Sequence, residues 1–140
     1  MSELVKHFRE LRVYREAFAV AMRIFEISKD WPADERYSLT DQIRRSSRSV
    51  CSNIAEAWRK RRYPSHFASK LSDADGEAAE TQVWLDFARE CGYITEPIHA
   101  EMDADFERIA GGLVNMMANA DNWCGPSSLR EEPASYNASP

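Results

Sequence analysis

The stretch Gln42-Ile-Arg-Arg-Ser-Ser-Arg-Ser-Val-Cys-Ser-Asn-Ile-Ala-Glu-Ala57 decides how the rest of this chain must fold. One side of it carries apolar or small residues at alternating spacings of three and four: Leu39, Ile43, Ser46, Val50, Ile54 and Ala57. This spacing is typical of an amphipathic helix with one buried face. Several other residues of the stretch are small, which would let a neighbouring helix or subunit approach closely: Ser47, Ser49, Ser52 and Ala55.

Helical spacing continues on both sides of this stretch. We expect helices at about residues 10–30, 38–61, 65–91 and 95–121. The first should be buried on more than one side, because it carries two adjacent apolar stripes: Leu11, Tyr14, Phe18, Ala21, Phe25 and Ser28, and Val13, Ala17, Val20, Ile24 and Ile27. The third should bury one row: Phe67, Leu71, Ala74, Ala78, Thr81, Leu85 and Ala88. The first should end at Trp31-Pro32, because a residue that precedes proline is pushed out of the helical region. Ser38 is a candidate N-cap of the second helix. Gly111-Gly112 interrupts the apolar row of the last helix and should weaken it by about 1 kcal/mol per glycine, unless close packing explains the pair.

Four long amphipathic helices with short connections predict an all-α fold, an antiparallel up-down four-helix bundle. The bundle should occupy residues 10–124 as one domain, after a short polar lead-in at residues 1–9. Residues 125–140 are rich in Ser, Pro, Asn and Glu and offer almost nothing to bury, so we expect a disordered tail.

The overall composition is that of a soluble globular protein, with 44% apolar and 29% charged residues. The net charge of −5 argues against a protein that coats nucleic acid non-specifically, although a local basic patch acts through its own field. Three widely spaced cysteines and the lack of a hydrophobic leader indicate a reduced, cytoplasmic protein. No apolar run approaches the roughly 18 residues that a membrane span needs.

The sequence contains no motif that predicts an enzyme. It has one Glu-x-x-His spacing, Glu96 to His99, where a di-iron bundle needs two, so we expect no metal and no cofactor. No Gly-rich phosphate loop or nucleophile motif occurs, and no catalytic residue is assigned. Cys51 would be reactive only if neighbouring arginines stabilised its thiolate.

Charge is distributed unevenly along the chain. Residues 34–62 contain eight Arg and Lys against four Asp and Glu, whereas residues 73–107 contain one Arg against eleven acids. One interpretation is a surface for the phosphates of RNA or DNA, formed by Arg44, Arg45, Arg48, Arg59, Lys60, Arg61 and Arg62. The other is that these side chains pair with acids, within the bundle or between subunits. Arginine suits phosphate and carboxylate equally well, so residue type does not decide between them.

Three runs in and around the second helix resemble a known family: Glu35-Arg36-Tyr37-Ser38-Leu39, Gln42-Ile43-Arg44-Arg45-Ser46 and Ser52-Asn53-Ile54-Ala55-Glu56-Ala57. The family is that of the four-helix-bundle proteins encoded in intervening sequences of bacterial 23S ribosomal RNA genes. The resemblance extends to Leu11-Arg12-Val13-Tyr14, Glu80-Thr81-Gln82 and residues 88–94, and it covers about residues 10–120. The chain departs from the family pattern at three positions, where Tyr14 replaces Trp, Cys51 replaces Pro and Ala57 replaces Gly.

This resemblance implies a bundle that assembles into a homopentamer. It also implies kinship with the accessory protein of diversity-generating retroelements, which binds nucleic acid and its reverse transcriptase. The seven basic residues named above would form a basic stripe on the second helix. From the resemblance and this stripe together, we predict a non-enzymatic oligomeric adaptor that binds RNA, or another nucleic acid, or a nucleic-acid-processing protein through the stripe. Structural polar roles are expected for Asn53, Glu56 and Glu80. The alternative is a structural or protein-interaction module whose arginines form salt bridges between subunits.

Overall fold

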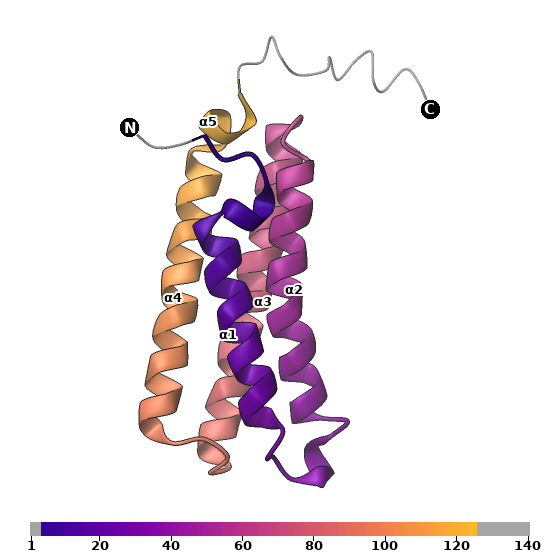
Figure 1. The fold of residues 1–140 in the computed structure, drawn as a ribbon, viewed down its shortest axis with the longest axis vertical. Helices are drawn as coiled ribbons and strands as arrows, with labels where there is room; N and C mark the ends of the chain where they lie inside the picture. The colour runs from indigo at the N-terminus through magenta and orange to yellow at the C-terminus, as the bar shows by residue number, and fades with distance from the viewer. Residues whose placement is uncertain (1–3, 126–140) are drawn as a thin grey trace.

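The structure, a computed structural model, describes residues 4–125. Four long helices form the bundle: α1 (Arg12–Ser28), α2 (Leu39–Arg59), α3 (Pro64–Glu90) and α4 (Glu96–Ala118). Two 3₁₀ turns, η1 (Phe8–Glu10) and η2 (Ala33–Glu35), precede α1 and α2, and a short α5 (Ala120–Cys124) follows α4. Successive long helices run in opposite directions, and α5 lies at the same end of the bundle as the start of α1 (Figure 1). The predicted all-α, antiparallel up-down bundle is confirmed.

The core lies between the four helices and is built from one face of each. α2 packs against α1 and α3, and α4 packs against α3 and α1. Every residue of the apolar row of α2 that the sequence indicated is buried, and Ile43, Val50 and Ile54 are fully inaccessible. The largest fully buried side chains are those of Phe67 and Phe106. The 3.6-residue period therefore locates the buried faces of α2 and α3 correctly.

The buried face of α1 differs from the expectation. The sequence suggested that both of its apolar stripes were buried, but Phe18, a member of one stripe, is 50% exposed. Met22, which belongs to neither stripe, is 46% exposed. The buried residues of α1 are Val13, Ala17, Val20, Ala21, Ile24 and Ser28. A helix at the corner of a four-helix bundle can bury only the side that faces its two neighbours, so its second apolar stripe stays at the surface.

The start of α2 is capped by a residue that the sequence analysis did not assign. Ser38 occupies the N-cap position, but its hydroxyl donates to Glu35 Oε1 at 2.6 Å instead of accepting from the helix. The backbone N–H of Leu39 donates to the same oxygen at 3.3 Å, and the hydroxyl of Tyr93 donates to Glu35 Oε2 at 2.8 Å. These hydrogen bonds hold the pKa of Glu35 below its ordinary value. Glu35 thus connects the start of α2 to the α3–α4 loop.

The last predicted helix, at residues 95–121, is interrupted in the structure. It ends at Ala118, and the backbone of Asn119 leaves the helical region with φ −112° and ψ 33°. The side-chain amide of Asn119 donates to the backbone oxygen of Asn115 at 2.9 Å. Asparagine favours helix ends because its side chain competes for backbone groups in this way. The predicted tail lies outside the described residues, apart from its first residue, Gly125.

Candidate nucleic-acid interface

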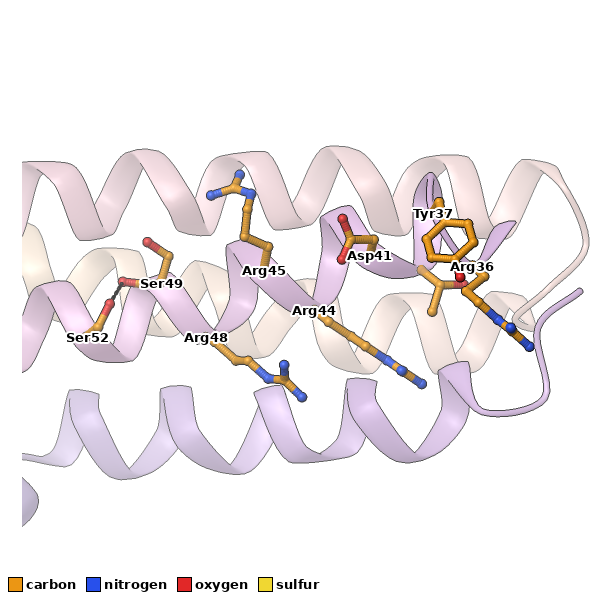
Figure 2. Close-up of a pocket in the computed structure, with 9 residues that line it drawn as sticks. Arg36, Tyr37, Asp41, Arg44, Arg45, Arg48, Ser49 and Ser52 are labelled. Atoms are coloured by element: carbon orange, nitrogen blue, oxygen red, sulfur yellow. Dashed lines mark hydrogen bonds between the residues drawn. The ribbon is translucent and has the colours of Figure 1, made fainter. Parts of the chain in front are cut away.

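The outward face of α2 forms an open groove of about 700 Å³ together with the loop before it (Figure 2). Charged and aromatic side chains dominate its lining: Arg36, Tyr37, Asp41, Arg44, Arg45 and Arg48. Three hydroxyl side chains, those of Thr40, Ser49 and Ser52, complete it. The groove contains four guanidinium groups and one carboxylate, so its local charge is opposite to that of the whole chain.

Arg44, the first predicted phosphate ligand, holds the end of α1. Its Nε donates to Ser28 Oγ at 2.8 Å and its Nη2 lies 3.4 Å from the backbone oxygen of Phe25. The guanidinium also lies over the Phe25 ring, 4.8 Å from its centroid. Because the carbonyl groups in the last turn of a helix carry partial negative charge, a cation here stabilises α1. Arg44 is therefore a packing residue, and it points toward α1 in Figure 2.

Arg45 points the opposite way, toward α3 (Figure 2). Its guanidinium forms an ion pair and a hydrogen bond with Glu80, and it lies 3.6 Å from Glu77 Oε1. Glu80 also accepts a hydrogen bond of 3.3 Å from the indole N–H of Trp84. This arrangement matches one part of the acid-pairing interpretation, because the carboxylate partners belong to the neighbouring helix of the same chain. Arg45 and Glu80 together link α2 to α3.

Two arginines of the groove remain available for a ligand. The side chain of Arg48 makes no hydrogen bond or ion pair within residues 4–125, and its guanidinium lies 5.7 Å from the centroid of the Phe25 ring. The side chain of Arg36 makes no hydrogen bond or ion pair within the same range, and it neighbours Tyr37, which is 85% exposed. Arg36 is not one of the seven predicted residues, and it precedes the first residue of α2. Its position inside a run shared with the family, Glu35-Arg36-Tyr37-Ser38-Leu39, was the signal that could have included it.

The other four predicted residues lie near the α2–α3 turn, at the far end of α2 from Arg36. Arg61 stacks on the Trp58 ring at 3.4 Å and donates to the Trp58 backbone oxygen at 2.9 Å, and burial lowers its pKa. Arg59 lies over the Phe8 ring at 5.8 Å, and Lys60 is exposed. Arg62 is also exposed. The seven predicted residues thus form two clusters, one on the outward face of α2 and one at its end and in the α2–α3 turn, and not one continuous stripe.

The three predicted polar anchors make contacts that differ in kind. The Asn53 amide is buried and donates to the backbone oxygen of Ser49 at 2.9 Å, within its own helix. Glu56 lies 3.3 Å from Lys70 Nζ, an ion pair that joins α2 to α3. Glu80 pairs with Arg45, as described above. A structural role for the three remains a prediction, and these contacts are consistent with it.

The Glu96 and His99 pair is engaged in a salt-bridge cluster. His99 Nε2 lies 2.8 Å from Asp86 Oδ1, and Arg89 Nη1 lies 3.4 Å from His99 Nδ1 and 3.5 Å from Glu96 Oε1. Within residues 4–125, no three His, Cys, Asp or Glu side chains are grouped so that they could hold a metal ion. Likewise, no helix in this range is long and apolar enough to cross a membrane.

Cys51 is expected to be unreactive in the folded protein. Burial raises the pKa of its thiol to about 11, and its Sγ faces the backbone oxygen of Ser47 at 3.9 Å. Since the thiolate is the nucleophile, a thiol reagent at pH 8 should label the exposed Cys91 in minutes and Cys51 only on unfolding. Mass spectrometry of the labelled peptides measures both, with Cys91→Ser as the control. Rapid labelling of native Cys51 would show instead that the arginines stabilise its thiolate.

Comparisons with known proteins connect this geometry to a family. A family model described as 23S rRNA-intervening sequence protein matches residues 9–115. Among solved structures, the chain is similar to a crystal structure of a protein of unknown function from the S23 ribosomal protein family of Bacteroides thetaiotaomicron. The two are 28% identical, the match covers 76% of this chain and 95% of that chain, and the TM-score is 0.69. No curated protein matches the chain significantly.

Proposed function

The chain belongs to the 23S rRNA-intervening sequence protein family, and from this premise we propose that it is a non-enzymatic, oligomeric adaptor that binds RNA through the outward face of α2. Neither the family description nor that of the similar structure names an activity. The proposal therefore rests on the site. The resemblance of the sequence to this family led us to expect a homopentamer, and we retain that expectation as part of the proposal.

The observation that carries the proposal is a pair of arginines, Arg36 and Arg48, that have no carboxylate partner in the described part of the chain (residues 4–125) and lie in a groove lined in part by hydroxyl groups. Guanidinium groups bind phosphate oxygens in a bidentate manner, and hydroxyl groups donate to them as well. Tyr37 adds an exposed ring on which an unpaired base could stack. Arginines, hydroxyls and an aromatic ring together are typical of surfaces that track a single-stranded or looped RNA.

The test measures how a labelled, structured RNA binds across a salt series. For the wild type we expect the logarithm of the binding constant to fall linearly with the logarithm of the salt concentration. In the double variant Arg36→Ala/Arg48→Ala, binding should weaken by roughly tenfold or more, and the slope should decrease by about 2, because each arginine neutralises about one phosphate. Fluorescence anisotropy provides the affinities, and light scattering of the same samples provides the mass of the assembly.

The matched control is Arg12→Ala/Arg108→Ala, which removes the same charge from the α1–α4 side, where both arginines pair with Glu16. This control should bind RNA with nearly the wild-type affinity and slope. Equal losses in the two double variants would mean that only net charge matters. A wild-type assembly that ignores RNA at every salt concentration would contradict the proposal and favour the second candidate.

That second candidate is a protein-interaction module without nucleic-acid binding. The ion pair of Arg45 with Glu80 favours it, because this pair shows that an arginine of α2 already binds carboxylates of α3. In this case Arg36 and Arg48 would bind acidic side chains of a protein partner. The double variant Arg36→Ala/Arg48→Ala would then fail to bind that partner or would lose part of the assembly. RNA would bind neither the wild type nor the double variant.

A further inference from the structure

A groove with an apolar lining runs between α1 and α2, beside the basic groove. It encloses about 410 Å³, and its walls include the half-exposed side chains of Phe18 and Met22 on α1. Small residues of α2, Cys51, Ser52 and Ala55, form its floor. Arg48 also lines it and adds a positive charge to its rim. The groove is therefore apolar inside, has small side chains on its α2 side and carries a positive charge at its edge.

A second apolar surface lies on the other flank of α2, where it meets α3. Val83 is 46% exposed and Phe87 is 54% exposed; with Trp84 they form a ridge along one side of α3. Trp84 and Phe87 line a pocket together with Tyr37 and Leu39 of the α2 side. Two exposed acids of α3, Asp86 and Glu90, stand three residues from Val83 and Phe87 respectively, and residues at this spacing are neighbours on a helix surface.

From these two surfaces we propose that copies of this chain associate head to tail, with the ridge of one copy (Val83, Trp84 and Phe87) in the α1–α2 groove of the next. The proposal rests on the oligomeric state in the proposed function and assigns the surfaces that form its contacts. Among residues 4–125, the exposed large apolar side chains outside the groove and the ridge are those of Leu4, Tyr37 and Val114. Exposed apolar clusters of this kind mark interaction sites.

Charge and shape both favour a second copy as the occupant. The groove has Arg48 at its rim, and the ridge has Asp86 and Glu90 beside it, so docking brings opposite charges together. Because the α2 residues at the floor of the groove have small side chains, the groove leaves room for the large side chains of Trp84 and Phe87. If two grooves docked against each other, their Arg48 side chains would repel each other. If two ridges docked against each other, the acids beside them, Asp86 and Glu90, would repel in the same way. The contact is therefore between two different surfaces.

A contact between different surfaces has a consequence for the assembly. Such heterologous contacts generate a ring when the rotation between copies closes, and an open filament when it does not. The groove and the ridge lie on the two flanks of α2 and not on opposite sides of the bundle, so successive copies turn in one direction. Repetition of this contact is therefore compatible with a closed ring, with α2 between the two contacts of each copy.

The experiment uses one variant for each surface of the full-length chain. Phe18→Glu places a charge in the groove, and Phe87→Glu places a charge on the ridge. Each variant alone should be monomeric by light scattering at concentrations at which the wild type is assembled. Mixed in equal amounts, they should form a heterodimer, because the intact ridge of one fits the intact groove of the other. The matched control, Val114→Glu on α4, changes an equally exposed apolar residue (53%) and should assemble like the wild type.

Other outcomes would overturn the inference. Two variants that stay monomeric when mixed, while circular dichroism shows that both are folded, would exclude this pairing of surfaces, as would variants that assemble normally. If either variant is unfolded, Met22→Glu and Val83→Glu replace them with the same expected result. A monomeric wild type would overturn both this inference and the oligomeric part of the proposed function. RNA binding is measured separately with Arg36→Ala, because Arg36 lines neither the groove nor the pocket beside the ridge, so a failure of RNA binding is distinguishable from a failure of assembly.

Discussion

Replacing Arg44 by glutamate is expected to lower the free energy of unfolding by about 2–3 kcal/mol. The substitution removes the hydrogen bonds to Ser28 Oγ and to the backbone oxygen of Phe25. It also places a carboxylate beside the last turn of α1, where the carbonyl oxygens already carry partial negative charge. Urea unfolding followed by circular dichroism measures the change as a lower midpoint at an unchanged slope.

The matched control is Arg36→Glu. It makes the same change of charge a few residues earlier in the chain, at an exposed side chain without a hydrogen bond or ion pair among residues 4–125. Its effect on stability should stay within about 0.5 kcal/mol, as is usual for exposed positions. If Arg44→Glu were equally mild and RNA binding were lost, Arg44 would belong to the phosphate surface after all. This pair of variants thus separates a packing arginine from a candidate phosphate ligand.

Replacing Gly112 by alanine is expected to lower the free energy of unfolding by about 1–3 kcal/mol, although alanine is the better helix former. An added Cβ would lie 2.6 Å from Val13 Cγ1 and 2.6 Å from Arg12 Nη2. The arginine end can move away. Val13 is 3% exposed, and a β-branched side chain in a helix has one strongly preferred rotamer, so α1 and α4 would have to separate. Thermal and urea unfolding both report the loss.

Its neighbour provides the control. Gly111 is exposed, and an added Cβ would meet nothing within 4 Å. Gly111→Ala should therefore stabilise the protein by about 0.5–1 kcal/mol through helix propensity alone. Two adjacent glycines should thus respond in opposite directions. Equal stabilisation by both substitutions would show that α1 and α4 do not approach as closely as the structure has them.

The arginines show where sequence reasoning stops. A helical projection places Arg44 and Arg48 on one side of α2, and composition alone treats them as equivalent. In the structure Arg44 stabilises the end of α1 and Arg45 pairs with Glu80, whereas Arg48 makes no side-chain hydrogen bond or ion pair with any residue between 4 and 125. The projection gives the direction of each side chain from its own helix axis. Which residue that side chain contacts depends on how the neighbouring helices are placed.

Local information was sufficient for the helices and for most of the core. Burial follows the 3.6-residue period because a helix buries the stripe that faces its neighbours. In α2 and α3 the apolar residues form a single row at this period, so the sequence indicates one buried face for each. α1 carries two apolar stripes, and only the packing of α2 and α4 against it decided that Phe18, a member of one stripe, stays exposed. The capping of α2 by Glu35 depends partly on Tyr93, which lies 58 residues further along the chain.

The amino-acid sequence therefore determined which segments are helical, the order of the helices and the buried faces of α2 and α3, because these depend on residues a few positions apart. Tertiary structure decided the rest. It determined which arginines are engaged, which of two adjacent glycines is needed for close packing and which apolar side chains form surfaces. Each of these depends on contacts between helices that are distant in the chain, and the spacing of residues within one helix carries no information about them.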